Sequence, residues 1–208
     1  MITYKRTSLI ISVIGLCFVL GLLVGQTFTT IDRGPANRQT ADIGRAFELV
    51  DDTGLRVSQD NLKGRYSLIY FGFTYCPDVC PTSLQIITLA LERMEAEPEK
   101  NDGASRIQPV FITVDPERDT PAALEQYVSH FHPRLRGWTG TPAQIDDAMR
   151  AFKVYRARVE DASNADGYTI DHSSIFYLMG PDGNFLTHFD HAVSPEELAA
   201  TLNRLIAG

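Results

Sequence analysis

Residues 66–83 read YSLIYFGFTYCPDVCPTS, and this stretch decides both the fold class and the chemistry that the sequence predicts. The apolar and aromatic run Leu68–Phe73 is typical of a buried strand, and it leads directly to Cys76 and Cys80, each followed by a proline. We expect the cysteines just before the next helix or in its first turn. Free N–H groups and the helix dipole lower the pKa of a thiol at that position. A thiolate is both a nucleophile and a ligand for soft metal ions, so dithiol redox chemistry and metal binding are both open.

The spacing of the cysteines does not separate these two kinds of chemistry. Redox pairs are usually Cys-x-x-Cys, whereas CPDVC contains one more residue and places the sulfurs a full helical turn apart. This arrangement can chelate a metal ion as readily as it can close a disulfide. A purely structural disulfide is disfavoured, because a bridge across so short a loop restrains little of the unfolded chain.

A membrane anchor is predicted at the N-terminus. Lys5 and Arg6 are followed by 25 residues without a charged side chain, 7–31, which include the third cysteine, Cys17. At about 1.5 Å per helical residue, this segment can cross a hydrocarbon core of about 30 Å. A cleaved signal peptide has a similar layout, but the apolar part here is longer than a usual signal core and no Ala-x-Ala-like site follows it. The positive-inside rule keeps the basic pair in the cytoplasm and places the rest of the chain outside.

The chain is therefore expected to consist of four segments. Residues 1–6 are the cytoplasmic N-terminus, 7–31 the transmembrane anchor, 32–42 a polar linker and 43–208 one domain. Residues 1–31 hold two basic and no acidic side chains, which leaves 17 Lys and Arg against 26 Asp and Glu, a net charge of −9. So acidic a domain is a poor match for nucleic acid, whereas a basic patch on a protein partner would complement it.

Strand and helix patterns alternate along the predicted domain. This order is typical of an α/β domain with a central mixed sheet flanked by helices. With a dithiol at the end of the first central strand, it predicts a thioredoxin-like fold with an N-terminal hairpin, preceded by one transmembrane helix. The predicted elements are a hairpin over 47–57, a helix after Pro81, strands over 107–114 and 154–159, a helix over 121–130 capped by Thr120, a helix from Thr141, an exposed loop over 160–168, a hairpin over 175–189 and a helix over 195–206.

His172 is the histidine that this fold is expected to bring to the cysteines. It lies just before the strand IFYLM, where redox members of the thioredoxin-like fold place a proline that contacts the substrate, and residues 169–175 contain no proline. Asp78 and Asp171 are candidates for orienting this site, although we prefer to interpret them as N-cap or solvated carboxylates. The other histidines are interpreted as surface or capping residues (His130, His132) and rim residues (His188, His191).

Two thiolates and one imidazole form a donor set that suits copper. Thiolates favour Cu(I), and imidazole also suits Cu(II). Zinc accepts the same donors, but a closed structural zinc site normally has a fourth protein ligand. Three ligands with an open position would suit a metal ion that is handed to a partner.

Three motifs, in this order, resemble the Sco/SenC family of membrane-anchored copper proteins: GFTYCPDVCPTSL at 72–84, VDPERDTP at 114–121 and DHSSIFYLMGPDG at 171–183. The similarity extends from about Ile43 to the C-terminus. The resemblance implies a thioredoxin-like domain that binds Cu(I) or Cu(II) and serves assembly of the CuA centre in subunit II of cytochrome c oxidase. Carried over by position, the copper ligands fall on Cys76, Cys80 and His172.

The resemblance leaves delivery of copper and reduction of thiols both open. Some family members are proposed to act as thiol-disulfide reductases on the CuA cysteines, and Cys76 and Cys80 would then be the redox pair. Copper transfer would be ligand exchange, with no catalytic residues. Expected partners are oxidase subunit II and a periplasmic copper donor or thioredoxin-like reductant. The expected location is the bacterial inner membrane, as a single-pass protein with its C-terminal domain in the periplasm. A peroxiredoxin-type activity ranks last, since CPDVC does not resemble its motif.

Overall fold

The computed structural model describes residues 43–96, 102–162, 164 and 166–207, which belong to one unit that comprises residues 40–208. The elements in chain order are β1 (Glu48–Asp51), β2 (Arg56–Ser58), the 3₁₀ helix η1 (Gln59–Leu62), β3 (Tyr66–Gly72), α2 (Val79–Glu95), the 3₁₀ helix η2 (Asp102–Arg106), β4 (Ile107–Thr113), α3 (Pro121–Val128), β5 (Arg136–Thr139), α4 (Pro142–Phe152), β6 (Arg156–Glu160), β7 (Tyr168–His172), β8 (Ile175–Met179), β9 (Phe185–Asp190) and α5 (Pro195–Ala207).

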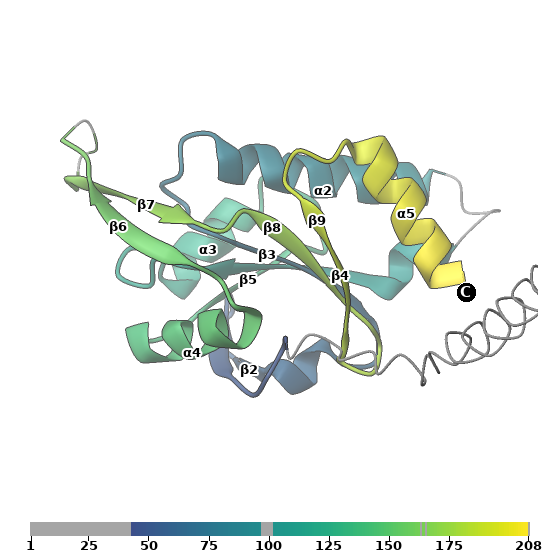
Figure 1. Ribbon diagram of the computed structural model, residues 1–208, viewed down its shortest axis with the longest axis horizontal. Coiled ribbons are helices and arrows are strands. Elements are labelled where there is room, and N and C mark those ends of the chain that lie inside the picture. Colours follow the sequence, from purple (N-terminus) through teal and green to yellow (C-terminus); the bar gives the residue numbers. More distant parts are fainter. Residues whose placement is uncertain (1–42, 97–101, 163, 165, 208) are drawn as a thin grey trace, which may run out of the picture. The chain divides into compact units, whose positions relative to one another are not determined.

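A seven-stranded mixed sheet forms the centre of the domain (Figure 1). Its strand order is β2-β1-β5-β4-β3-β8-β9, in which β3 runs parallel to β4 and antiparallel to β8. The N-terminal hairpin belongs to this sheet, because β1 pairs with both β2 and β5. β6 and β7 form a separate two-stranded ribbon that extends past one end of the sheet (Figure 1). The thioredoxin-type α/β fold and its hairpin are thus confirmed.

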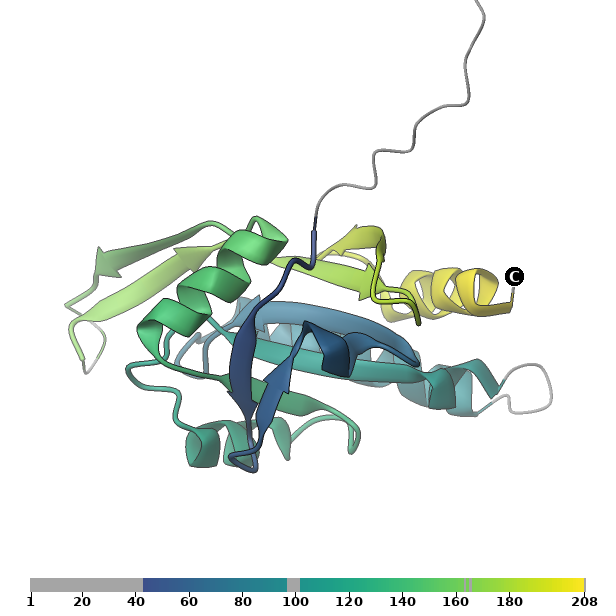
Figure 2. The same cartoon turned by 90° about the horizontal axis from the view of Figure 1, so that it is seen from below.

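Helices cover both faces of the sheet. α2 and α5 pack against each other on one side, and α4 lies on the other (Figures 1 and 2). Successive side chains of β3 point to opposite faces. The hydroxyl of Tyr70 lies 3.7 Å from the sulfur of Cys80 in α2, whereas the ring of Phe71 lies 5.3 Å from that of Phe152 in α4. Burial on both faces explains the uninterrupted apolar run in this strand.

The apolar residues that recur along the predicted helices lie in the hydrophobic core. Removal of one buried aromatic ring from such a core typically lowers the free energy of unfolding by about 3–5 kcal/mol. The predicted inward side chains of α2 and α4 are all buried: Leu84, Ile87, Leu91, Met94, Ile145, Ala148, Met149 and Phe152.

Two predicted termini have the expected local chemistry. Thr120 caps α3, since its hydroxyl accepts a hydrogen bond of 3.2 Å from the N–H of Ala123. This helix ends at Val128, two residues before the predicted end. Gly183 has φ of +80° in the turn between β8 and β9, so a glycine is favoured there, as the hairpin pattern predicted.

Two predictions were wrong, and one strand was not predicted at all. Tyr168 was expected in an exposed loop, but it is buried and begins β7. β5 was not predicted, because it is only four residues long and contains Gly137, which packs closely against Leu124 of α3. His132 was interpreted as a surface or capping residue, but it is buried, and its backbone N–H donates to the hydroxyl of Thr88 in α2 at 3.1 Å. Long-range packing that is invisible in the local pattern accounts for both buried residues.

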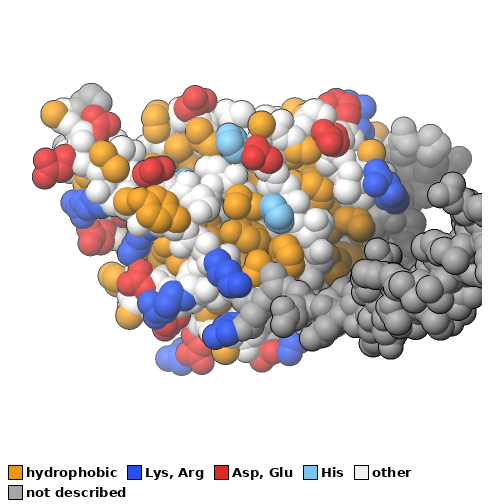
Figure 3. Space-filling model, viewed as in Figure 1, with side chains coloured by type: hydrophobic (Ala, Val, Ile, Leu, Met, Phe, Trp, Pro, Cys, Tyr) orange, Lys and Arg blue, Asp and Glu red, His pale blue; other side chains and the backbone are white. Residues whose placement is uncertain are grey.

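The predicted segments 1–6, 7–31 and 32–42 lie outside the described residues. Within the described ranges, none of the helices combines the length and the apolar character needed to cross a bilayer. On the face shown in Figure 3, acidic and basic side chains lie among apolar ones.

Candidate metal centre

The end of β3 and the start of α2 place the two cysteines as the sequence predicted. Cys76 precedes the helix and is partly buried, whereas Cys80 is the second residue of α2 and is fully buried. The backbone N–H of Cys80 donates to the sulfur of Cys76 at 3.4 Å. Both cysteines are free thiols. The first turn of the helix therefore points N–H groups at one of the two sulfurs.

Gly72 allows Cys80 to approach the strand this closely. A Cβ atom at position 72 would lie 2.8 Å from the sulfur of Cys80 and 2.7 Å from the ring of Phe111. Side-chain Cβ atoms do not occur at such distances from their neighbours. The helix can therefore rest against β3 only because residue 72 has no side chain.

The surroundings of the two thiols push their pKa values apart. The pKa of Cys76 is lowered to about 6: a hydrogen bond from Cys80 is the largest cause, burial opposes it, and the N–H groups of Asp78, Cys80 and Val79 also lower the value. The same hydrogen bond, together with burial, raises the pKa of Cys80. At neutral pH, Cys76 is therefore the thiolate and Cys80 keeps its proton. Such a pair offers one ready nucleophile or ligand and one reserve thiol.

His172 ends β7 and lies at the cysteines. Its Nε2 atom is 3.6 Å from the sulfur of Cys80, although the two residues are 92 positions apart in the chain. Nδ1 lies 3.1 Å from the carbonyl oxygen of Ser173, which accepts a hydrogen bond only if this nitrogen carries the proton. Burial lowers the pKa of His172, so the ring is neutral at pH 7. The Nε2 lone pair is then free to bind a metal ion.

The distance between His172 and Cys80 fits two ligands of one ion. Donor atoms at about 2.3 Å (sulfur) and about 2.0 Å (nitrogen) from a metal ion, at a tetrahedral or trigonal angle, lie roughly 3.5–3.8 Å apart. Among the described residues, however, no three His, Cys, Asp or Glu side chains surround a single point as they stand. Cys80 contacts both of the other residues, so adjustment of the Cys76 or His172 side chain is needed before all three can bind one ion.

Two buried residues that the sequence analysis did not single out, Tyr70 and Asp119, hold parts of the site in place. The hydroxyl of Tyr70 donates to the sulfur of Cys80 at 3.7 Å, and its ring lies 6.3 Å from that of His172. The buried carboxyl of Asp119 accepts hydrogen bonds from the N–H and hydroxyl of Thr74, at 3.1 and 2.6 Å, and from Thr113 at 2.6 Å. Asp119 thus links β4 to the start of the cysteine loop, residues 73–78 between β3 and α2. The motif VDPERDTP, which contains Asp119, was the feature of the sequence that could have indicated this role.

The remaining candidates lie around the rim. Asp78 occupies the N-cap position of α2, but its side chain accepts no capping hydrogen bond. It is an exposed carboxylate that accepts from the hydroxyl of Thr82 at 3.5 Å. Asp171 is exposed, and its charge raises the pKa of His172 against the larger effect of burial. His188 and His191 are exposed, as expected of rim residues, and so is His130.

Two exposed aromatic side chains flank the cysteines and the histidine. Tyr75 precedes Cys76 and is 49% exposed, while Tyr155 is 58% exposed. The carbonyl oxygen of Tyr155 accepts a hydrogen bond of 3.2 Å from the N–H of Ser173, which places this tyrosine beside His172. Aromatic side chains at such positions can anchor a protein partner.

Comparisons with known proteins show which family the chain resembles. The SCO1/SenC family profile matches residues 35–207. An SCO2-like protein of Rickettsia conorii is 48% identical over 156 residues, which cover 75% of this chain and 73% of that protein. Solved structures include Bradyrhizobium japonicum ScoI with copper bound (44% identity, TM-score 0.68, 78% of this chain and 98% of that one). Arabidopsis thaliana ScoI with copper bound is also similar (38% identity, TM-score 0.73, 79% and 98%).

A further solved structure is that of BsSco, described by its disulfide switch and as a member of the Sco family of cytochrome c oxidase assembly proteins. It is 26% identical, with a TM-score of 0.60 over 79% of this chain and 94% of that one. The profile match covers well over half of the residues, and the Rickettsia relative is aligned over three quarters of the chain. The chain belongs to the SCO1/SenC family.

Proposed function

We propose that this protein binds one copper ion through Cys76, Cys80 and His172 and delivers it to the CuA centre of cytochrome c oxidase subunit II. The observation that carries this proposal is the approach of the His172 Nε2 atom to the sulfur of Cys80, at 3.6 Å. A redox dithiol does not need an imidazole there, whereas a Cys₂His copper site does. The copper-bound ScoI structures of two relatives support the choice of metal.

The protonation states favour stepwise loading of the site. Cys76 is already a thiolate at neutral pH, and the Nε2 lone pair of His172 is available. Cys80 must lose its proton when it becomes a ligand, so copper binding releases about one proton per ion. Oxidation of both thiols to a disulfide would remove two of the ligands, which links copper loading to the redox state of the compartment.

Delivery is proposed to proceed by ligand exchange at the exposed side of the site. Cys76 is only partly buried, and the exposed Pro77 and Asp78 follow it. A docked apo-subunit can therefore reach this ligand before it reaches Cys80. Tyr75 and Tyr155 would provide aromatic contacts for that partner, and the acidic character of the chain favours a basic surface on it.

The proposed location follows from the N-terminal sequence. Residues 7–31 would anchor the protein in the bacterial inner membrane, with residues 1–6 in the cytoplasm and residues 32–42 as the linker. The copper-binding domain would then lie in the periplasm. A periplasmic copper donor, or a thioredoxin-like reductant that keeps the thiols reduced, would be a further partner.

Thiol-disulfide exchange with the CuA cysteines is the second candidate function. The separation of pKa values between Cys76 and Cys80 favours it, because one thiol attacks and the other resolves the mixed disulfide. The disulfide switch of the relative BsSco also supports this alternative. In this function His172 would not be needed as a ligand.

A copper titration separates the two functions. Residues 40–208, which form one unit, are titrated with Cu(I) against a competing chelator, as wild type and as His172→Ala. We expect the variant to bind copper at least about tenfold more weakly, roughly 1.4 kcal/mol, with both thiols still oxidisable. The exposed His188→Ala is the matched control and should retain wild-type affinity. Equal affinities of wild type and His172→Ala would count against the copper site.

A further inference from the structure

The β6–β7 ribbon carries His172 but is not part of the central sheet. Among the described strands, β6 and β7 pair only with each other, and His172 is the last residue of β7. After Ser173 and Ser174 the chain enters β8, which pairs with β3, so the chain itself keeps the His172 end of the ribbon near the cysteine loop. The other end of β7, at Tyr168, has no backbone pairing with the central sheet, so contacts between side chains are needed to fix the orientation of the ribbon and, with it, of His172.

Arg118, in the loop between β4 and α3, makes contacts that bridge the two segments. Its side chain is only 9% exposed, and it forms an ion pair with the buried Asp115. Toward the ribbon, it reaches Asp166 at 3.4 Å and the carbonyl oxygen of Tyr168 at 3.5 Å. Its guanidinium carbon also lies 3.8 Å from the centre of the Tyr168 ring.

The same guanidinium contacts the cysteine loop. Its carbon lies 4.5 Å from the centre of the Tyr75 ring and 5.8 Å from that of Phe73. Tyr75 immediately precedes Cys76 in the chain. The Nη2 atom is buried without a hydrogen-bond partner among the described residues, so aromatic rings surround part of this group. A planar guanidinium can stack on rings in this way, whereas an ammonium group cannot.

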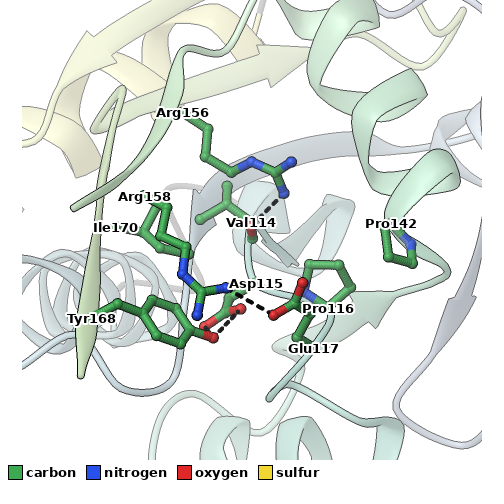
Figure 4. Close-up of a pocket in the computed structure, with 9 residues that line it drawn as sticks. All are labelled: Val114, Asp115, Pro116, Glu117, Pro142, Arg156, Arg158, Tyr168 and Ile170. Carbon is green, nitrogen blue, oxygen red and sulfur yellow. Dashed lines mark hydrogen bonds and ion pairs between the residues drawn. The ribbon is translucent and has the colours of Figure 1, made fainter. Parts of the chain in front are cut away.

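Tyr168 is held on the ribbon side by further contacts, several of which Figure 4 shows. Its hydroxyl donates to Asp115 at 3.1 Å. The guanidinium of Arg158 lies 3.5 Å from the centre of its ring and forms an ion pair of 3.0 Å with Glu117. Two guanidinium groups at such short distances cannot share one face of a ring, so Tyr168 lies between Arg118 and Arg158.

We propose that Arg118 is a positioning residue that fixes His172 relative to Cys76 and Cys80. It would do so because its buried guanidinium contacts Tyr168 of the ribbon and Tyr75 of the cysteine loop at the same time. Tyr168 and His172 are the two ends of the same paired strand, so a shift of the first is transmitted to the second. This inference rests on the proposed function only in that His172 serves as a copper ligand.

The test uses the full-length protein in detergent, with Arg118→Gln, Arg118→Lys and the control Arg150→Gln. Arg150 lies in α4, its side chain is 70% exposed, and it pairs with Asp147 of the same helix. In the metal-free protein, the His172 ring signal is followed by NMR and assigned with His172→Ala. We expect both Arg118 variants to shift or broaden this signal, because lysine keeps the charge but not the stacking. Arg150→Gln should leave the signal near its wild-type position.

Copper affinity gives the second measurement. Arg118→Gln should weaken Cu(I) binding by about tenfold, within the range for residues that orient a ligand, and should add nothing in the His172→Ala background. Losses that multiply in the double variant, or a wild-type His172 signal in Arg118→Gln, would overturn the proposal. If His172→Ala alone leaves copper binding intact, the copper-ligand role fails, while the NMR signal still tests the positioning. Should Arg118→Gln not fold, Tyr75→Leu removes only the loop contact and must shift the same signal.

Discussion

Replacement of Gly72 by alanine tests how closely the strand and the first turn of α2 must pack. The added Cβ would lie 2.8 Å from the sulfur of Cys80, 2.7 Å from the ring of Phe111 and 3.1 Å from that of Tyr70. Ordinary contacts are about 3.5–4.0 Å, so the sulfur must move by roughly 0.7–1.2 Å. Such overpacking typically costs about 1–3 kcal/mol of unfolding free energy. Because Cys80 would move relative to His172, we also expect a copper affinity about tenfold lower.

The assay combines urea unfolding with Cu(I) competition, and Gly137→Ala is its matched control. A Cβ at Gly137 would lie 2.9 Å from the Cβ of Leu124, in a part of the core formed by β5 and α3. The control should lose a similar unfolding free energy and keep its copper affinity. If Gly72→Ala keeps both wild-type stability and wild-type copper affinity, the close packing of Cys80 on β3 is not what positions the thiol.

Two further predictions follow from titrating groups. In a Cys17→Ser background, the alkylation rate of Cys76 should rise with pH, with a midpoint near 6. Cys80→Ala should move this midpoint upward, because it removes the largest cause of the lowered Cys76 pKa. A midpoint that does not move would contradict this explanation. Burial raises the pKa of Asp119, so the native state holds this proton more tightly than the unfolded state. The unfolding free energy should therefore fall as the pH rises above about 4, and Asp119→Asn should flatten this slope in urea unfolding. An identical slope in the variant would refute that role.

The central elements could be predicted from sequence because their signals are local. β3 is an uninterrupted apolar run, and α2 repeats its apolar residues every three or four positions. The placement of Cys76 and Cys80 follows directly from where the strand ends and the helix begins. The position of His172 required the fold class as well, since only the thioredoxin-like topology places the segment before β8 beside the thiols.

The contacts that orient the site could not be predicted, because they join residues far apart in the chain. Arg118 contacts Tyr75 and Tyr168 through packing, which leaves no periodic pattern in the sequence. The burial of Tyr168 likewise depends on the guanidinium groups that stack on it. Asp119 lies in a recognisable motif, yet its hydrogen bonds to Thr74 become apparent only once β3 and β4 are paired.

X-ray absorption of the copper-loaded protein, compared between wild type and His172→Ala, tests the central claim most directly. The proposed site predicts two sulfur donors and one imidazole nitrogen at copper in the wild type, and loss of the nitrogen in the variant with the sulfurs retained. A wild-type spectrum that contains only sulfur donors, or one that His172→Ala leaves unchanged, would contradict it.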